Sequence, residues 1–424
     1  CVNAIGGVEV LDQHTIEYKL PDQKPERIPI SDKNALPSLL SDFMHRFEMM
    51  PAACKEASFA QGLYGYTSYD AVQFFESVEI AQPKAAPIGL LRYRLYQYVI
   101  AIHHHKDELF ICENQIDGLS SEASLLESII RSKDVPVFPF QLQGTERSAL
   151  TDAAYMEMVK KGIASCMRGD VFQIVLSRSF TQPFSGDEFN VYRALRSINP
   201  SPYLFFFDYG DYKIMGSSPE AQLIVRGGKA TLHAIAGTFY RSGNDTADTI
   251  AAEALLRNKK ENAEHVMLVD LARNDLSRQC SDVQVTQLRK VQYYSHVIHL
   301  VSEITGNVDP HTSPFALLAT CFPAGTLTGA PKVKAMQLIQ EFEPTPRGYY
   351  GGAIGYIGFD GSCNHAIMIR SFLSRENTLV YQAGAGVVAD SDPASECREV
   401  NNKLAALKQA MLNAQHISES SNYR

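Results

Sequence analysis

The chain has 424 residues, of which 45% are hydrophobic and 20% charged, and its formal net charge is −8 at pH 7. This length can bury a large core, as one big domain or two. The acidic balance excludes a basic field for nucleic acid, and no apolar run approaches the roughly 20 residues that span a bilayer. We therefore expect no nucleic-acid and no membrane partner. Eight scattered cysteines without a Cys-x-x-Cys pair indicate reduced thiols and a cytoplasmic location.

The first part of the chain alternates short strand patterns with loops. Strands are expected at residues 8–11, 15–20, 91–102 and 109–112, and helices at 37–46 and 122–131. Residues 62–70, rich in Gly and Tyr, are interpreted as a turn that leads into a short helical stretch. A polar passage at 135–147 is the expected boundary between an N-terminal region, 1–145, and a catalytic region, 150–418.

Three consecutive histidines, His103, His104 and His105, suggest either a metal site or the end of a hairpin. Strand geometry sends His104 to the face opposite its two neighbours, so the hairpin is the favoured interpretation.

From residue 151 onward, helices alternate with strands that are neighbours in sequence. Helices are expected at 152–168, 191–198, 253–278, 314–321 and 333–343. Strands are expected at 171–177, 203–209, 213–216, 221–226, 229–235, 283–288, 293–304, 350–359, 363–373 and 379–388. Tight turns at 360–361 and 375–377 favour antiparallel pairing, so we expect an α+β fold and not a βαβ one.

Two helices carry carboxylate pairs. In the long helix expected at 253–278, Glu261 and Glu264 lie three residues apart and so share one face. A second helix begins near Pro393 and places Glu396 and Glu399 three apart, with Lys403 one turn further. Two such helices could enclose a hard dication such as Mg²⁺. Two solvated helix faces are the alternative.

Two glycine-containing segments are suited to contact a ligand. Residues 322–332 form a Gly- and Thr-rich loop that runs into a helix, where backbone N–H groups bind anions. It is not a P-loop, because Pro331 precedes the lysine and Val333 follows it, so a carboxylate or enolate fits better than a nucleotide. Gly384 and Gly386 end a strand, where backbone can approach a ligand or simply form a bulge.

Three polar residues stand in apolar or desolvated positions. Arg370 lies in an apolar strand and needs a carboxylate partner, from a ligand or from an ion pair. His299 is also flanked by apolar residues, and a satisfied core histidine is its ordinary explanation. Glu220 follows a proline at the end of a strand, where a partly desolvated carboxyl could be held protonated as an acid.

Together these segments resemble the family of chorismate-utilising enzymes. The matches are long at residues 263–275, 323–332 and 350–355, and the resemblance covers about 152–412. Residues 64–70 and 74–76 resemble the family's N-terminal region. The resemblance implies two large packed, mostly antiparallel β-sheets with helices outside and an active site between them.

Two positions separate the branches of this family. Isochorismate and salicylate synthases carry a water-activating Lys where this chain has Gln173, and Gln cannot act as a base. Aminodeoxychorismate synthases typically carry a nucleophilic Lys where this chain has Ala236. The resemblance therefore implies a site that uses delivered ammonia, converting chorismate to anthranilate and pyruvate in tryptophan biosynthesis. The alternative is aminodeoxychorismate synthase activity.

The resemblance also implies roles for individual residues. Mg²⁺ would bridge the ring carboxylate of chorismate to Glu264 and Glu399, with Glu261 and Glu396 close by. Glu220 would protonate the leaving C4 hydroxyl, with His299 hydrogen-bonding the same oxygen. The remaining expected substrate positions are Thr238, Ala236, Thr328, Tyr350, Arg370, Gly384, Gly386 and Lys403.

Partners follow from the same resemblance. A glutamine amidotransferase subunit would supply ammonia, since the chain shows no cysteine nucleophile motif of that class. Tryptophan would be a feedback inhibitor that binds near Asn199, Pro202 and Tyr203, with a Leu-Leu-Glu-Ser element expected upstream of Cys1.

Two further classes of protein are weighed against this interpretation. A carboxylate-bridged di-metal oxidoreductase needs Glu-x-x-His pairs, whereas His265 lies four residues after Glu261. The complete set of carboxylates disfavours a catalytically silent subunit.

Overall fold

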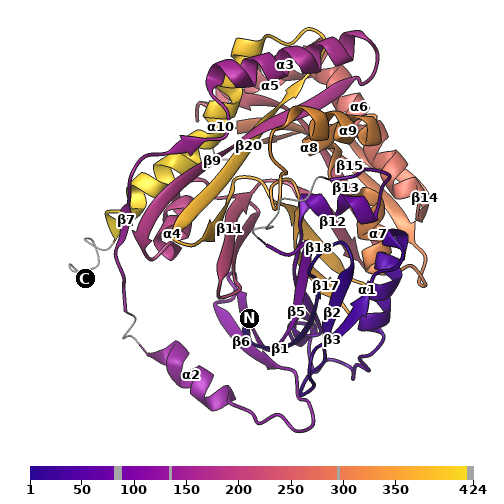
Figure 1. The fold of residues 1–424 in the computed structure, drawn as a ribbon, viewed down its shortest axis with the longest axis vertical. Coiled ribbons are helices and arrows are strands. Elements are labelled where there is room, and N and C mark those ends of the chain that lie inside the picture. The colour runs from indigo at the N-terminus through magenta and orange to yellow at the C-terminus, as the bar shows by residue number, and fades with distance from the viewer. Residues whose placement is uncertain (81–87, 133–135, 294–296, 418–424) are drawn as a thin grey trace.

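The protein folds as two antiparallel β-sheets packed against each other, with helices on their outer faces (Figure 1). A computed structural model describes residues 1–80, 88–132, 136–293 and 297–417. The larger sheet has 12 strands and the smaller has 8. The expected α+β fold with two large, mostly antiparallel sheets is confirmed.

The larger sheet joins strands from both ends of the chain. Its order is β14 (Cys280–Tyr293), β15 (Val297–Val308), β13 (Lys229–Tyr240), β12 (Ala221–Arg226), β18 (Cys363–Ile367), β17 (Ala353–Gly358), β4 (Gly62–Thr67), β5 (Leu91–His103), β1 (Val2–Val10), β2 (Thr15–Lys19) and β3 (Glu26–Pro29), with β6 (Glu108–Glu113) beside β5. Because β4 pairs with β17, strands of the expected N-terminal and catalytic regions share one sheet. The boundary near residues 145–150 stays a prediction.

The smaller sheet belongs mainly to the second half of the chain. Its order is β10 (Tyr203–Asp208), β11 (Tyr212–Ser218), β19 (Ser371–Arg375), β20 (Thr378–Val387), β9 (Gln173–Gly186) and β16 (Gly329–Ala330), with β7 (Phe140–Leu142) and β8 (Arg147–Ser148) also beside β9. Apolar side chains of this sheet pack against α3 (Asp152–Met167), α4 (Phe189–Ile198) and α10 (Pro393–Ala414) to form one core.

The other helices are α1 (Leu36–Met44), α2 (Ala123–Arg131), α5 (Asp245–Arg257), α6 (Lys259–Ser277), α7 (Pro314–Cys321), α8 (Gly325–Thr328) and α9 (Lys332–Phe342), with 3-10 turns η1 (Lys33–Ala35), η2 (Ala57–Ala60) and η3 (Tyr69–Phe74). Of these helices, α9 packs against β9 and β16 of the smaller sheet and α8 against β9, while α1, α5, α6 and α7 lie against the larger sheet or one another. Side-chain oxygens of Thr151, Ser313 and Asp392 cap the starts of α3, α7 and α10, as helix N-termini require. None of the described helices has the length and apolar character needed to cross a membrane.

The hairpins expected at residues 103–105, 360–361 and 375–377 are confirmed. Strand β5 ends at His103 and pairs with β6, β17 pairs with β18, and β19 pairs with β20. Glu376 and Asn377 have φ of 50° and 54°, the positive values that a two-residue hairpin turn uses.

The expectation of a turn at residues 62–70 was wrong, because residues 62–67 form strand β4. Gly65 lies so close to β5 that a Cβ placed there would stand 2.0 Å from the Arg92 carbonyl oxygen. Glycine here therefore serves close strand packing, not a turn.

The single helix expected at 253–278 is two helices, α5 and α6, separated at Asn258. This residue is extended, with ψ of 111°, and its side-chain oxygen accepts a hydrogen bond from the Glu261 backbone N–H at 3.2 Å. Asparagine competes with the helix for backbone donors and here starts a new one.

The single strand expected at 363–373 is also two elements, in different sheets. Strand β18 lies in the larger sheet and β19 in the smaller. The chain crosses between the layers at residues 368–370, and Arg370 takes a left-handed φ of 50°. Arg370 therefore stands at the junction of the two sheets.

An ion pair buried between the layers joins several of these elements. The Arg347 guanidinium lies 2.6 Å from a Glu343 carboxylate oxygen, and the two side chains are 1% and 4% exposed. Glu343 also accepts from the Ser177 backbone N–H and hydroxyl of β9, both at 2.8 Å. Arg347 donates to the carbonyl oxygens of Val175 in β9 and Leu327 in α8, both at 2.6 Å. The pair therefore fixes β9 against α8.

We expect Arg347→Met to lower the free energy of unfolding by about 3–5 kcal/mol, because it leaves the Glu343 carboxylate buried without its cation. The measurement is urea unfolding followed by circular dichroism. Arg131→Met is the control, because its ion pair with Glu127 is exposed and contributes at most about 1 kcal/mol. Equal unfolding midpoints for Arg347→Met and the unsubstituted chain would contradict this role.

Candidate active site

Glu220 lies between β11 and β12 and is half-buried. Its carboxyl accepts a hydrogen bond from the Thr326 hydroxyl of α8 at 2.9 Å. Burial raises the pKa of Glu220 from 4.5 to about 7, against the lowering effects of the Thr326 hydrogen bond and the Lys403 charge. A raised pKa agrees with the expectation of a desolvated carboxyl at this position, and its role as an acid stays a prediction.

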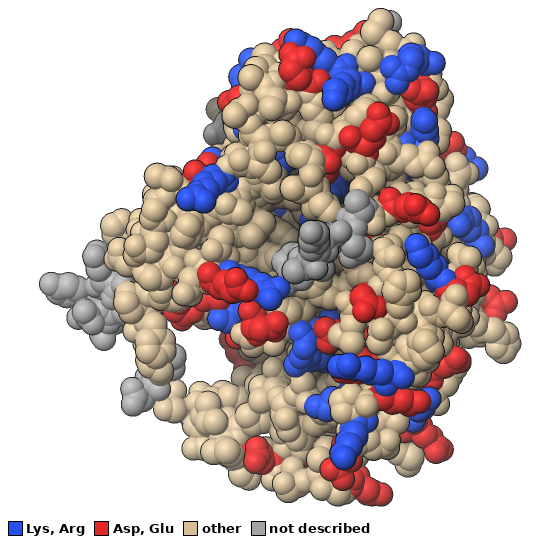
Figure 2. Space-filling model, in the orientation of Figure 1, with Lys and Arg blue, Asp and Glu red and all other residues tan. Residues whose placement is uncertain are grey.

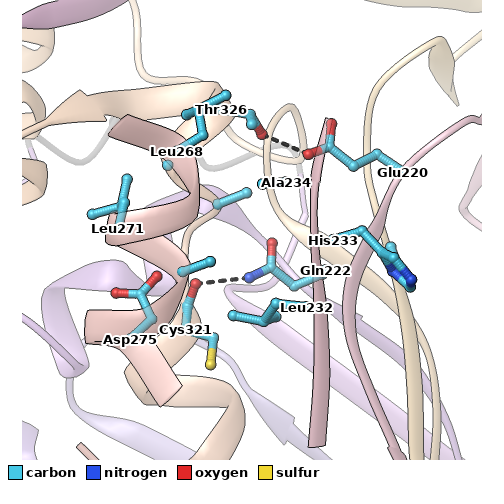
Figure 3. A pocket seen from close by; sticks show the side chains of 14 residues that line it. Glu220, Gln222, Leu232, His233, Ala234, Leu268, Leu271, Asp275, Cys321 and Thr326 are labelled. Carbon is cyan, nitrogen blue, oxygen red and sulfur yellow. Dashed lines mark hydrogen bonds between the residues drawn. The ribbon is translucent and has the colours of Figure 1, made fainter. Parts of the chain in front are cut away.

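A cavity opens beside Glu220, between α6 and the strands β12 and β13 (Figure 3). Its lining also includes residues 324–326 of the segment that was expected to bind anions. The lining side chains labelled in Figure 3 are Glu220, Gln222, Leu232, His233, Ala234, Leu268, Leu271, Asp275, Cys321 and Thr326. The expected acid therefore stands at the edge of a mostly apolar cavity.

Strands β13 and β15 bring two more expected residues together. Thr238 pairs with His299 in the sheet, and Ala236 pairs with Leu300, with a register shift between them. His299 is half-buried. The side chains of Ala236 and Thr238 lie outside the described part of the structure, so their roles stay predictions.

Arg370 and Tyr350 form a second group at the junction of the sheets. Burial lowers the pKa of the Arg370 guanidinium, while Tyr350 and Glu399 raise it. Among the described residues no hydrogen-bond or ion-pair partner of this guanidinium is found. Tyr350 is buried, and its hydroxyl faces the Gly384 backbone N–H, with burial raising its pKa to about 12. Arg370 is half-buried, and a partly desolvated guanidinium with unused donors is suited to a ligand carboxylate.

Two glycines of β20, Gly384 and Gly386, lie beside residues that contact the carboxylates of α10 and α6. Lys403 of α10 donates to the Gly384 carbonyl oxygen at 2.8 Å and pairs with Glu399 at 2.7 Å. At Gly386, a Cβ would stand 2.5 Å from the side-chain nitrogen of Gln173, which donates to Glu264 of α6 at 2.9 Å. Glu399 and Glu264 are therefore each linked to β20 through one residue, Lys403 and Gln173 respectively.

The candidate ligands for a metal ion are the carboxylates of α6 and α10. No three His, Cys, Asp or Glu side chains in the described ranges gather into a protein-only metal site. Mg²⁺ does not require one, since it is usually held by one or two carboxylates together with water and substrate oxygens. Glu264 and Glu399 have the donor type that this partial set needs, and their metal role stays a prediction. Glu396 is buried and Glu261 half-buried, and their metal role stays a prediction.

Thr328 and Thr326 differ in what they contact. Thr328 is fully buried, and its hydroxyl donates to the Ala324 carbonyl oxygen at 3.1 Å, within its own helical turn. Thr326, two residues earlier, reaches Glu220 instead. Sequence reasoning named Thr328 and missed Thr326, although both lie in the same motif.

The residues expected to bind tryptophan lie around β10 and β11. Asn199 ends α4, and its carbonyl oxygen accepts from the Ser217 hydroxyl. Tyr203 begins β10 opposite Ser218, and burial raises its pKa. Pro202 is exposed. In the described part of the chain, no hydrogen bond joins these residues to Glu220 or Glu264.

Surface charge agrees with the composition. On the face drawn in Figure 2, acidic and basic side chains are interspersed and do not collect into a basic patch. A polyanionic partner therefore finds no electrostatic footprint on this face.

Comparison with known proteins places this geometry in a family. Residues 15–409 match the profile of the chorismate binding enzymes. The chain is 38% identical over 378 residues to anthranilate synthase component 1 of Aquifex aeolicus, covering 84% of this chain and 76% of that one. It is 37% identical over 414 residues to the protein of the same name from Neisseria meningitidis serogroup C, covering 94% and 83%.

A solved structure of a protein with the same name as these relatives has a similar fold. The crystal structure of anthranilate synthase component I from Streptococcus pneumoniae superposes with a TM-score of 0.80 at 29% identity, covering 96% of this chain and 91% of that one. The family profile, which spans residues 15–409, includes the segments that hold Glu220, Glu264 and Arg370. The chain therefore belongs to the family of chorismate binding enzymes.

Proposed function

We propose that the chain is the chorismate-converting subunit of an anthranilate synthase, which makes anthranilate and pyruvate from chorismate and ammonia. The relatives that carry this name support the proposal. The observation that carries it is the Gln173–Glu264 hydrogen bond, which puts an amide beside the carboxylate helix. An amide cannot activate water as a base, so the nucleophile must arrive ready to react.

Two clusters of residues between the sheets would bind chorismate, one around Arg370 and one around the carboxylates of α6 and α10. Arg370, Tyr350 and the backbone at Gly384 and Gly386 would hold the enolpyruvyl carboxylate. Lys403 would add positive charge beside the ring carboxylate. Glu264 and Glu399, with Glu261 and Glu396 nearby, would hold Mg²⁺, which when bound neutralises charge on the ring carboxylate.

The chemical step would use Glu220 as an acid. Ammonia forms a bond to C2 while the C4–O bond breaks, and the oxygen leaves as water after taking the Glu220 proton. His299 would hydrogen-bond that oxygen, and Thr238 would contact the ring. The apolar cavity and the Thr326 hydrogen bond support this role, because they keep the carboxyl protonated at neutral pH.

Ammonia would come from a glutamine amidotransferase partner. The relatives' name, component 1, supports a second subunit. Tryptophan, as the end product, would inhibit by binding near Asn199, Pro202 and Tyr203. The described structure has all eight cysteines as free thiols, which supports a cytoplasmic location.

Aminodeoxychorismate synthase activity is the alternative, and product identification separates the two. We expect the chain, given chorismate, Mg²⁺ and an ammonium salt, to release anthranilate and pyruvate in equal amounts. Anthranilate is read by its fluorescence and pyruvate by coupled reduction to lactate. Consumption of chorismate without pyruvate would support the alternative, and unreacted chorismate would exclude both.

We expect the rate of the unsubstituted chain to fall as pH rises through about 7, because the acid must be protonated and Glu220 loses its proton in that range. Glu220→Gln should lower kcat by roughly 10²–10⁴-fold. Rates are compared at a constant concentration of free ammonia. Glu157→Gln, at an exposed position on α3, is the control. A flat profile between pH 6 and pH 8 would exclude Glu220 as the acid.

We expect Glu264→Gln to lose turnover by roughly 10²-fold or more while remaining folded, because it removes charge from the metal site at constant size. Activity is titrated with Mg²⁺, and folding is followed by thermal melting. Asp270→Asn is the matched control, since Asp270 lies on the same helix in an exposed ion pair. Near-normal turnover of Glu264→Gln at saturating Mg²⁺ would refute the metal role.

A further inference from the structure

The cavity beside Glu220 extends away from the junction of the sheets and toward Asp275 (Figure 3). Leu268, Leu271 and Ala272 of α6 form one wall, and Leu232 and Ala234 of β13 form the other. Few polar atoms line it, so each one indicates what the cavity can hold.

Gln222 is the polar side chain in the middle of this cavity. It is 3% exposed, and its side-chain nitrogen donates to the Cys321 carbonyl oxygen at 2.8 Å. Its side-chain oxygen is buried and has no hydrogen-bond partner. Leaving a buried acceptor unpaired costs about 1–3 kcal/mol, so such an atom normally has a partner in protein or in ordered water.

Glu220 and Gln222 are two residues apart, and Figure 3 shows both side chains pointing from the strand toward α6. Glu220 precedes β12, and the pairing of β12 with β18 shifts register at Gln222, so regular strand spacing does not hold here. Figure 3 shows the Gln222 side-chain oxygen on the side of its amide that faces Glu220. One water molecule with two hydrogen bonds of about 2.8 Å joins acceptors that lie roughly 4.5–5.5 Å apart.

At the far end Asp275 pairs with Lys332 at 2.7 Å, and their side chains are 12% and 8% exposed. The Lys332 ammonium also donates to the Cys321 carbonyl oxygen at 3.4 Å. Gln222 and Asp275 present acceptor oxygens to the cavity, and Glu220 presents a carboxyl that accepts hydrogen bonds once it has lost its proton. Water, which brings two donors, fits such a lining.

We infer that this cavity is a water site that serves the acid: a water held between Gln222 and Glu220 returns a proton to the Glu220 carboxylate in each turnover. The inference rests on the proposed function. Gln222 is then a positioning residue, because it acts on the reaction only through this water and Glu220.

The protons balance over one cycle. Glu220 gives its proton to the C4 oxygen, which leaves as water. The new C2–N bond leaves the nitrogen with an extra proton, which passes to solvent. In the second half of the cycle C2 loses a proton, the C3–O bond breaks, and the released enolpyruvate takes up one proton to become pyruvate. The cavity water protonates Glu220 and takes a proton from solvent in turn, so no net proton is consumed over the two halves.

Other charged groups face Glu220 and its cavity from the packed elements. They are Lys403 of α10, Asp275 of α6 and Lys332 of α9. His233 lies at the cavity edge, and Figure 3 shows its ring turned away from Gln222; it lies 3.7 Å from Glu303. None of these groups bonds the Gln222 oxygen.

The test is Gln222→Met, which keeps the side-chain length and removes the acceptor. The Cys321 carbonyl oxygen retains its Lys332 donor, so the substitution leaves no new unpaired oxygen there. We expect the rate of a single turnover, in which Glu220 begins protonated, to stay within about twofold of the unsubstituted rate. Steady-state kcat should fall by roughly tenfold, with a larger solvent deuterium isotope effect.

Gln97→Met is the matched control, because Gln97 is another buried glutamine, in β5, and bonds Ser120 and Glu113 far from the cavity. It should change neither rate. If single-turnover and steady-state rates of Gln222→Met fall together, Gln222 has only a structural role and the inference is wrong. If neither rate changes, the inference is also wrong.

A second measurement does not depend on activity. A high-resolution crystal structure of the full chain should contain a water bonded to the Gln222 oxygen and Glu220, and Gln222→Met should lack it. A cavity without ordered water in the unsubstituted chain would overturn the inference. If the unsubstituted chain makes no anthranilate, the proposed function fails instead, whatever the crystal contains.

Discussion

The buried pair of Arg347 and Glu343 is the interaction on which the other parts of the site depend. A buried ion pair offsets its desolvation only when every donor and acceptor is used, and here the strand β9 and the helix α8 supply the remaining partners. Strand β9 begins with Gln173, which holds Glu264, and α8 carries Thr326, which holds Glu220. One network between the sheets thus sets the distance between the carboxylate helix and the acid.

The chain crosses from one sheet to the other at Arg370, and this crossing leaves a charged side chain that needs a partner. Arg370 is left-handed and partly desolvated at this crossing, and among the described residues no side chain forms an ion pair with it, although the Glu399 charge favours its charged form. Both features are unfavourable in a molecule without ligand, and such features concentrate where a ligand compensates them. The enolpyruvyl carboxylate of chorismate has the charge and shape that a guanidinium fork pairs with best.

The carboxyl groups of Glu220 and Glu399 lie in different environments. Glu220 faces an apolar cavity, so its pKa rises to about 7 and it can carry a proton at neutral pH. Glu399 is exposed, and its carboxylate lies 2.7 Å from the Lys403 ammonium. Under the proposed function, burial and charge would divide proton transfer and cation binding among carboxyl groups of the same chemistry.

The sequence by itself determined the local elements and the residue types of the site. Hairpin turns, helix caps, the α+β pattern and the carboxylate pairs Glu261/Glu264 and Glu396/Glu399 follow from periodicities that span a few residues. The tertiary structure decided which of these residues meet. Thr326 reaches Glu220 across 106 residues and Gln173 reaches Glu264 across 91, whereas Thr328 turns into its own helix. Strand β18 and β19 share one apolar pattern but lie in different sheets, because a period of two sets the face of a side chain and not the layer that its strand joins.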